Sequence, residues 1–310
     1  MLHFCSVINN SHSITQELEI EGRTVHVRRL DLIDEHVNGN KFYKLKYNVL
    51  AAQENGCQPI LSFGGPYSNH LYSLAAAGKK YGIPTIGIVR GEWSGRAGEL
   101  HTPTLRFAQS CGMRLEFVTN LAYAEKETDD FKAWLRDEYG DFHLVPEGGS
   151  NFLGVNGCME ILNSKDNEEY DHIFLACGTG ATTAGITLSK SPNQKVYAVS
   201  ALKGGDFLRD EIRKHLYYFF MDGDAADEMM TDVAVLVDYH FGGYGKWTPD
   251  LEQFIAEQKA SNNLPLDPVY TAKAFFALKD QLAKGMIAKH EKVLFIHTGG
   301  LQKTEEPISF

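Results

Sequence analysis

The segment "HIFLACGTGATTAGITLSK", residues 172–190, places an apolar run that ends in glycine directly before a stretch with helical periodicity. Strand, glycine loop and helix in this order are typical of a parallel sheet. Further strand-length apolar runs are "PILSFGG", "PTIGIVRGE", "RLEFVT", "KVYAVSAL" and "KVLFIHTGG", at residues 59–65, 84–92, 114–119, 195–202 and 292–300. All but the last precede a helical stretch, so the sequence predicts an α/β fold with mostly parallel strands.

A segment rich in glycine and asparagine, "VPEGGSNFLGVNG" at residues 145–157, interrupts this series. Such residues mark a break between two periodic regions. If the chain crosses over there, the strands between residues 59 and 118 form one sheet and those from residue 172 onward form another. A ligand would then lie between two lobes, near the carboxyl ends of both sets of strands.

The composition is that of a globular protein with a negative net charge. Of the 310 residues, 43% are apolar and 23% are charged, and the formal net charge is -10. This charge argues against nucleic acid or a polybasic membrane surface as a partner. The N-terminus has no basic region followed by an apolar run, and no run of about 18 apolar residues occurs. We therefore expect a cytoplasmic protein without a membrane span.

The cysteines and histidines form no disulfide or metal pattern. The five cysteines are scattered and never spaced C-x-x-C, and the 12 histidines include no H-E-x-x-H. We therefore expect neither a disulfide framework nor a metal site, and we expect the cysteines to be small buried side chains.

Two glycine loops could hold anionic groups. In "CGTGATTAG", residues 177–185, glycines let the backbone approach a phosphate and the following helix offers free N–H groups. This loop matches neither the Walker A pattern nor the dinucleotide fingerprint. In "SFGGPYSNH", residues 62–70, the amides could hold a carboxylate. The alternatives are a plain tight turn for the first loop and a helix N-cap for Ser68 in the second.

Three lysines lie within six residues of "NGNKFYKLKYNVL", residues 38–50. On a helix Lys41 and Lys44 share one face, and Lys46 points away. Because the same helix carries several aromatic and aliphatic side chains, we expect it to be largely buried. A desolvated lysine beside a second cation has a lowered pKa, which is the condition for an amine that forms a Schiff base. The alternative is a surface helix whose lysines extend into solvent.

A phosphate loop, a carboxylate loop and an activated lysine together describe a pyridoxal phosphate site that acts on an amino acid. The segment "GNKFYKLKY" resembles the "GGNKxRKLEY" segment of the fold-type II pyridoxal-phosphate enzymes, which include D-cysteine desulfhydrase and 1-aminocyclopropane-1-carboxylate deaminase. Six further segments match in the family's order, over roughly residues 35–300: "FGGPYSNH", "VPEGGSN", "GTGATTAG", "FGGYG", "PLDPVYTAKA" and "FIHTGG".

The resemblance implies a two-lobed α/β fold like that of the tryptophan synthase β subunit, with open, mostly parallel twisted sheets flanked by helices. It implies a large cofactor-binding domain of residues 1–43 and 154–310, a small domain of residues 44–153, and an active site in the cleft between them. It also suggests a homodimer that acts on a small amino acid.

The resemblance assigns the cofactor-binding residues. Lys41 would hold pyridoxal phosphate covalently and exchange protons at the substrate carbon, and Lys44 would lie on the phosphate side. The residues that match the family's phosphate cup are Gly178, Thr179, Gly180, Ala181 and Thr182.

The resemblance also places residues on the substrate side. Ser68, Asn69 and His70 match the loop that faces the substrate carboxylate, and Asn69 would also lie near the ring oxygen of the cofactor. Tyr244 and Tyr270 match two active-site tyrosines, with Tyr270 against the pyridine ring. Taken without the resemblance, both tyrosines are best explained by core packing.

Two positions separate the branches of the family. The deaminases carry a glutamate after the second tyrosine and a leucine before the final glycine pair, whereas this chain has Thr271 and Thr298. A neutral hydroxyl opposite the pyridine nitrogen makes the ring a weaker electron sink, which suffices for elimination of a good leaving group. The sequence therefore favours β-elimination, with D-cysteine as the expected substrate and pyruvate, sulfide and ammonia as products.

Other functions fit parts of the sequence. The same cofactor could serve cyclopropane-ring deamination or dehydration of serine. A non-catalytic protein that binds a nucleotide or another anion would use "GTGATTAG" alone, and Lys41 would then carry no cofactor.

Overall fold

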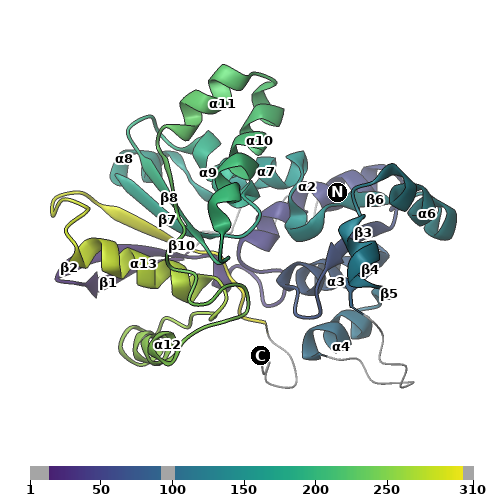
Figure 1. Cartoon of the computed structure of the whole chain (residues 1–310), viewed down its shortest axis with the longest axis horizontal. Helices are drawn as coiled ribbons and strands as arrows, with labels where there is room; N and C mark the ends of the chain where they lie inside the picture. Colours follow the sequence, from purple (N-terminus) through teal and green to yellow (C-terminus); the bar gives the residue numbers. More distant parts are fainter. Residues whose placement is uncertain (1–13, 92–101, 303–310) are drawn as a thin grey trace.

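The computed structural model describes residues 14–91 and 102–302, which form two β-sheets in two lobes (Figure 1). The large sheet has the strand order β1-β2-β10-β7-β8-β9, and the small sheet has the order β5-β4-β3-β6. Only β1 and β2 pair antiparallel among the described strands. The predicted α/β fold with mostly parallel sheets is confirmed, and the two groups of predicted strands do lie in different sheets.

The strands are 3 to 7 residues long. Those of the large sheet are β1 (Ile14–Ile20), β2 (Arg23–Arg29), β7 (His172–Cys177), β8 (Lys195–Ser200), β9 (Val233–Leu236) and β10 (Val293–His297). Those of the small sheet are β3 (Ile60–Gly64), β4 (Thr85–Arg90), β5 (Arg114–Val118) and β6 (His143–Val145).

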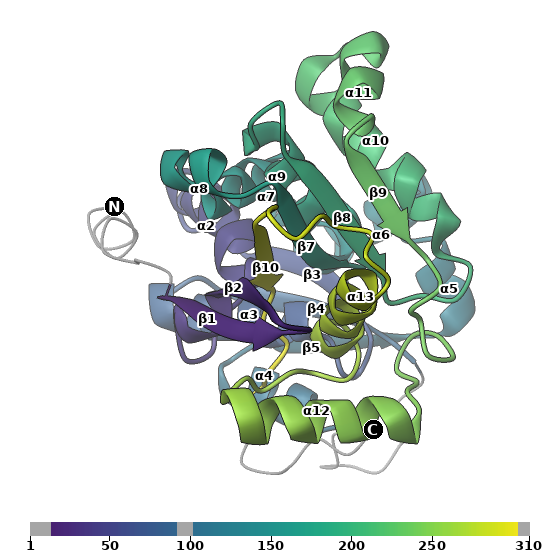
Figure 2. The same ribbon diagram turned by 90° about the vertical axis from the view of Figure 1, so that its left-hand side faces the viewer.

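Helices cover both faces of the large sheet, which is why its central strands β7 and β10 are buried along their whole length. On one face Phe295 of β10 meets Phe275 of α13 (Thr271–Ala283), with ring centroids 4.9 Å apart. The neighbouring Leu294 and Ile296 point to the other face and pack in the cluster that includes Ala184 of α9 (Ala181–Ser189). Figure 2 shows α13 in front of the sheet, and α12 (Pro249–Asn262) below α13 at the bottom of the view.

The small sheet is also covered on both faces. Leu61 and Phe63 of β3 pack against α5 (Asn120–Ala124) and α6 (Asp129–Tyr139). Ile60 belongs to the cluster on the other face, which includes side chains of α3 (Asn69–Tyr81). The remaining helices are α2 (Asn40–Glu54), α4 (Pro103–Ser110), α7 (Phe152–Cys158), α8 (Ser164–Glu169), α10 (Leu208–Phe220) and α11 (Gly223–Met230).

Helices α2 and α7 carry the chain between the lobes. Helix α2 leads from the large sheet to β3, and α7 follows β6 and packs against α9, so residues 145–157 do contain the predicted crossover. The two helices touch closely, because a Cβ at Gly157 would lie 2.0 Å from the Tyr43 carbonyl oxygen. The expected domain limits, 43/44 and 153/154, therefore both fall inside helices, and the division into domains stays a prediction.

Four strands escaped the sequence analysis. β1 and β2 are an edge hairpin in which polar residues alternate with apolar ones, so neither reads as a continuous apolar run. β6 and β9 are only 3 and 4 residues long. The segment between β4 and the helical stretch predicted to follow it includes residues 92–101, which are outside the described residues.

The expectation of buried cysteines holds for Cys158 and Cys177 but is wrong for Cys57, which is exposed in the turn after α2. Cys111 is partly buried, and Cys5 lies outside the described residues. Within residues 14–91 and 102–302, no helix has the length and apolar character that crossing a membrane requires.

Candidate active site

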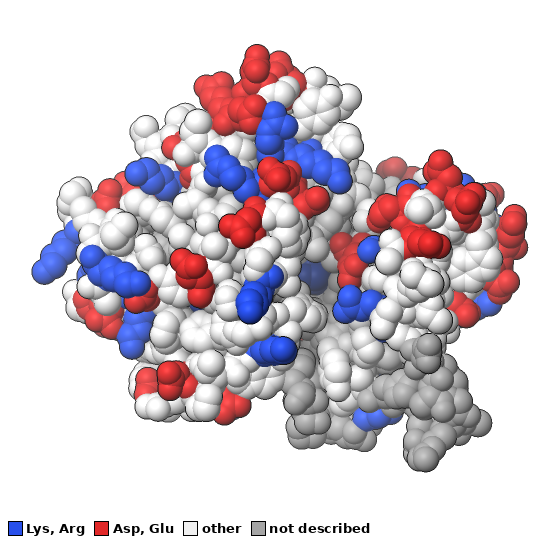
Figure 3. All heavy atoms as spheres, in the orientation of Figure 1, with Lys and Arg blue, Asp and Glu red and all other residues white. Residues whose placement is uncertain are grey.

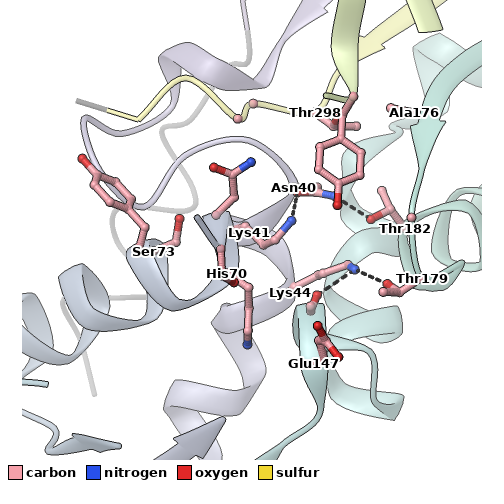
Figure 4. A pocket seen from close by; sticks show the side chains of 18 of the residues that line it. Asn40, Lys41, Lys44, His70, Ser73, Glu147, Ala176, Thr179, Thr182 and Thr298 are labelled. Carbon is pink, nitrogen blue, oxygen red and sulfur yellow. Dashed lines mark hydrogen bonds between the residues drawn. The ribbon is translucent and has the colours of Figure 1, made fainter. Parts of the chain in front are cut away.

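A cavity of about 460 Å³ lies between the two lobes, a size typical of small-molecule sites. Its wall includes residues at or just after the carboxyl ends of strands from both sheets: Gly65 after β3, Arg90 in β4, Gly178 after β7, Leu202 after β8 and Thr298 after β10. This is the edge at which parallel sheets bind ligands. Figure 3 shows the molecule hollowed between the lobes, and Figure 4 shows the lining side chains.

Twelve of the fourteen predicted site residues line this cavity. They are Lys41, Lys44, Ser68, Asn69, His70, Gly178, Thr179, Gly180, Thr182, Tyr244, Tyr270 and Thr298. The two that do not line it are Ala181 and Thr271, both of which are fully buried.

Gly39 fixes where α2 begins. It has φ 63° and ψ -151°, and its amide donates to the Leu30 carbonyl oxygen at 2.9 Å. A Cβ at this position would lie 2.2 Å from the Thr298 carbonyl oxygen, so only glycine allows the two backbones to cross. The next amide, Asn40 N, donates to the same oxygen at 3.1 Å. The start of α2 is therefore attached to the chain that leaves β10.

Lys41 is held by a short hydrogen-bond chain. Its Nζ donates to Asn40 Oδ1 at 2.8 Å, and Asn40 Nδ2 donates to Thr182 Oγ1 at 2.9 Å (Figure 4). Burial, and then the charge of Lys44, lower the pKa of Lys41 to about 7. A neutral amine is therefore accessible to Lys41 near pH 7, as expected for a lysine that attacks a carbonyl.

Lys44 lies one helical turn further, on the same face. Its buried Nζ donates to the Gly148 carbonyl oxygen at 2.9 Å and lies 3.4 Å from Thr179 Oγ1. Burial lowers its pKa as well. Lys46 points away from the cavity and pairs with Glu160, 2.5 Å away. The expected division of the three lysines is therefore seen in the structure.

The loop between β7 and α9 presents hydrogen-bond donors. Gly180 has φ 80°, and after it the first amides of α9 point out of the helix end without helical acceptors. Thr179 and Thr182 add hydroxyls, and the Thr179 carbonyl oxygen accepts from His215 Nε2 at 3.2 Å. Ala181 contributes only backbone here, since its side chain is buried. Amides, hydroxyls and the Lys44 ammonium together fit a phosphate.

The loop between β3 and α3 also carries side chains that form hydrogen bonds. Ser68 Oγ accepts from Leu71 N at 3.2 Å, so Ser68 is the N-cap, and its hydroxyl proton stays available. His70 Nε2 lies 2.8 Å from Ser62 Oγ, which itself donates to the Val145 carbonyl oxygen. His70 Nε2 must therefore carry the proton. Burial and the two cavity lysines hold its pKa well below the usual value, so the imidazole is neutral.

Tyr270 and Tyr244 stand edge to face, with ring centroids 6.1 Å apart, and burial raises the pKa of both phenols. Tyr270 lies against the phosphate loop, because a Cβ at Gly178 would be 3.0 Å from its Cε1. Asp267 fixes the turn that carries Tyr270 by accepting from Tyr270 N at 2.8 Å. The same carboxylate accepts from Thr271 N and from Thr271 Oγ1, at 2.9 and 2.7 Å.

This contact explains why Thr271 does not face the cavity. Its hydroxyl hydrogen is donated to Asp267, and the side chain is completely buried beneath the tyrosine turn. Thr298, the other branch position, does line the cavity. Only one of the two branch positions, Thr298, therefore lines the site.

The cavity is positively charged although the protein is not. The charged residues that line it are Lys41, Lys44 and Arg90 on one side and Glu147 as the single described carboxylate. Figure 3 shows both blue and red side chains bordering the hollow between the lobes, so the positive charge belongs to the lining residues and not to the whole rim. Anionic ligands are attracted to such a site.

Sequence analysis missed several lining residues. Asn40 stands next to Lys41 in the segment that we analysed, but its reach to Thr182 depends on how α2 meets α9. Glu147 lies in "VPEGGSN", which we interpreted as a crossover. Arg90 ends a predicted strand, and the rule that ligands bind at strand ends could have indicated it.

The fold, the paired lysines and the phosphate loop define a protein of the pyridoxal-phosphate class. Residues 10–299 match the family described as "Pyridoxal-phosphate dependent enzyme", and the chain belongs to that family. Its residues fit the cofactor, since Lys41 can bind the carbonyl carbon and the α9 end can hold the phosphate. The expected family, enzyme class and cofactor are confirmed.

The chain is similar to proteins that are named for two reactions within this family. A Pyrococcus horikoshii protein, named as a candidate 1-aminocyclopropane-1-carboxylate deaminase, is 30% identical over 91% of this chain and 86% of its own. The mitochondrial bifunctional D-cysteine desulfhydrase/1-aminocyclopropane-1-carboxylate deaminase of Arabidopsis thaliana is 28% identical over 90% and 73%. The solved structure of an ACC deaminase homologue, 24% identical, matches 97% of this chain and 96% of its own with a TM-score of 0.76, which shows the shared fold.

Proposed function

We propose that the protein catalyses β-elimination from a small β-substituted amino acid, with D-cysteine and water giving pyruvate, sulfide and ammonia. The observation that carries this choice is the scarcity of acids in the site. Glu147 is the single carboxylate among the described lining residues, and Thr298 occupies one branch position with a hydroxyl. Asp267, beneath the tyrosine turn, accepts four hydrogen bonds from Val269, Tyr270 and Thr271. Without an acid to protonate the ring nitrogen, a reaction with a good leaving group is favoured.

Pyridoxal phosphate supplies an electron sink that stabilises negative charge on the substrate α-carbon. Lys41 Nζ removes the α-proton, since its lowered pKa leaves a neutral amine near pH 7. Ser68 and Asn69, at the start of α3, bind the substrate carboxylate through a hydroxyl, an amide and the free N–H groups of the helix end. Lys44 and the α9 end hold the phosphate.

The two tyrosines are placed to serve the departing group. Their raised pKa keeps both phenols protonated at neutral pH, so each can donate a hydrogen bond. Tyr270 is packed against Gly178 deep in the wall, whereas Tyr244 is half exposed at the cavity mouth. Tyr244 is therefore better placed than Tyr270 to donate a hydrogen bond to the leaving group as it departs through the cavity mouth.

The test is a product assay with purified, cofactor-loaded protein. D-cysteine is expected to release sulfide and pyruvate in equal amounts, with a shift of the visible cofactor band. Lys41→Ala should abolish turnover and the covalent band, whereas Lys79→Ala, an exposed lysine on α3, should leave both intact. A wild-type protein that shifts its band without releasing sulfide would contradict the proposed substrate while preserving the cofactor assignment.

Ring deamination is the second candidate, because the relatives just described carry the name of 1-aminocyclopropane-1-carboxylate deaminase. Opening the ring of that substrate would yield a four-carbon keto acid and ammonia without sulfide. The same assay with this substrate, and with D-serine and L-serine, separates the candidates. Thr271→Glu, the deaminase residue, would place a second carboxylate against Asp267 and is expected to destabilise the fold.

The homodimer expected from the resemblance and the cytoplasmic location expected from the sequence stay predictions. Sedimentation of the loaded protein tests the first.

A further inference from the structure

The chain that follows β10 crosses the cavity. Thr298, Gly299, Gly300, Leu301 and Gln302 all line it. In Figure 4 this chain runs from Thr298 across the top of the view, towards the side where the helix of Ser73 lies. The large lobe therefore sends a backbone segment across to the small lobe at the level of the site.

Gln302 makes the contact at the end of this crossing. Its Nε2 donates to Asn69 Oδ1 and lies 3.4 Å from the Tyr67 carbonyl oxygen. Its Oε1 accepts from Thr104 Oγ1 at 2.6 Å, and Thr104 is completely buried. All three partners belong to the small lobe, and one of them is a predicted site residue.

These contacts decide which way both amides face. A backbone carbonyl oxygen only accepts, so the atom of Gln302 that faces Tyr67 is the nitrogen. The same nitrogen donates to Asn69, so the Asn69 atom that accepts must be its amide oxygen. Asn69 Nδ2 is then left over, and it has no hydrogen-bond partner among the described residues. Asn69 can therefore offer two N–H donors to the cavity that it lines.

We propose that Gln302 is a positioning residue that holds the Asn69 amide with its NH2 group towards the bound cofactor. In the opposite orientation Asn69 would present an oxygen, which repels the oxygens of an anionic ligand. The proposal rests on the proposed function only for the presence of pyridoxal phosphate in the cavity, and the contact of Asn69 with the ring oxygen of the cofactor is the expectation that the family resemblance gives. It assigns Gln302 an effect on ligand affinity that passes through Asn69, in addition to any strengthening of the contact between the lobes.

Gln302→Glu reverses the hydrogen-bond polarity at this point. A carboxylate has no proton to donate, so Asn69 would turn its NH2 group towards Glu and its oxygen towards the cavity. Loss of one hydrogen bond and creation of one repulsive contact should raise the dissociation constant of pyridoxal phosphate by about 10- to 100-fold. Gln302→Met removes the hydrogen bond without favouring either orientation of the Asn69 amide, so it should raise this dissociation constant only a few-fold.

The added negative charge by itself also weakens binding of an anion, so the experiment is a double-mutant cycle. Pyridoxal phosphate is titrated into apo-protein, by fluorescence, for wild type, Gln302→Glu, Asn69→Ala and the double variant. If Gln302 acts through Asn69, Gln302→Glu weakens binding at least tenfold more in the wild-type background than in the Asn69→Ala background. Gln109→Glu, an exposed glutamine on α4, measures the effect of the charge outside the cavity.

Equal effects of Gln302→Glu in both backgrounds would overturn the proposal, because a charge effect or a simple strap does not depend on Asn69. That result leaves the proposed function standing if the wild-type protein binds the cofactor and eliminates sulfide. Unchanged affinity in Asn69→Ala would overturn both the Gln302 proposal and the assignment of Asn69. A wild-type protein that binds no pyridoxal phosphate would remove the proposed function together with the inference.

Discussion

Replacing Gly39 by alanine adds one methyl group where the start of α2 crosses the chain after β10. At φ 63° and ψ -151°, Gly39 occupies a backbone region that is essentially restricted to glycine. The new Cβ would lie 2.2 Å from the Thr298 carbonyl oxygen and 2.7 Å from Gly299 Cα. Both neighbours are backbone atoms, so no side-chain rotation relieves the contact, and one of the two chains must move.

The magnitude follows from two contributions. Alanine at these dihedral angles costs about 1–3 kcal/mol of backbone strain. Separating the chains also breaks the 3.1 Å hydrogen bond from Asn40 N to Thr298 O, which adds about 1–2 kcal/mol. The matched control is Gly82→Ala, because Gly82 has φ 69° and ψ 31° and a Cβ there would meet nothing within 4 Å. That variant pays only the left-handed penalty, about 1–2 kcal/mol.

Denaturant unfolding of the two apo-proteins, and titration of each with pyridoxal phosphate, measure the difference. We expect Gly39→Ala to lose about 2 kcal/mol more stability than Gly82→Ala. It should also bind the cofactor more weakly, because Asn40 and Lys41 follow the displaced residue directly. Equal stability losses in the two variants, with equal cofactor affinity, would refute the reasoning that the crossing of backbones positions Lys41.

Three further predictions concern the cavity and an anchor of the loops beside it. The rate at which apo-protein captures pyridoxal, which lacks the phosphate, should rise with pH through about 7 as Lys41 loses its proton. Lys44→Met should move that rise to higher pH because a neighbouring cation is removed, and an unmoved profile in stopped-flow absorbance would contradict it. Thr298→Leu should raise ring-opening activity relative to sulfide release. An unchanged ratio of products would contradict the idea that residue 298 separates deaminases from desulfhydrases. Lys273→Met removes a buried ammonium that donates to the carbonyl oxygens just before Leu202 and Tyr244. It should cost about 2–4 kcal/mol in thermal unfolding and raise the KM more than it lowers kcat, and an unchanged KM would show that the Tyr244 loop does not depend on this anchor.

Some features of the site could be predicted from sequence because they depend on local chemistry. A glycine loop after a buried strand and two lysines one turn apart keep their meaning in any fold, and both appear in the cavity. Lys41 was expected to have a lowered pKa on the same local grounds, since its helix is apolar and Lys44 is near.

Other features depend on partners that sequence order does not reveal. The sequence predicts Thr271 to be a site residue, but its hydroxyl donates to Asp267, four positions earlier, and its side chain is buried. Asn40 reaches Thr182 and Gln302 reaches Asn69 across more than 140 and 230 positions of the chain. The first pair forms within the large lobe and the second joins the two lobes, so both depend on the tertiary fold. The edge hairpin β1–β2 was missed because its outer face is polar.

The place of β10 in the large sheet bears on how the enzyme is made. This strand lies between β2 and β7, although it is the last strand of the described chain, and the crossing at Thr298 holds the start of α2. A nascent chain without residues 293–302 lacks the central strand β10 of the large sheet. It also lacks the Thr298 carbonyl oxygen that holds the start of α2, the helix that carries Lys41. Such contacts between distant parts of a chain form late in folding. Cofactor capture should therefore require synthesis through β10 and Thr298, and a chain that ends at residue 291 should fail to bind pyridoxal phosphate even where its small lobe has folded.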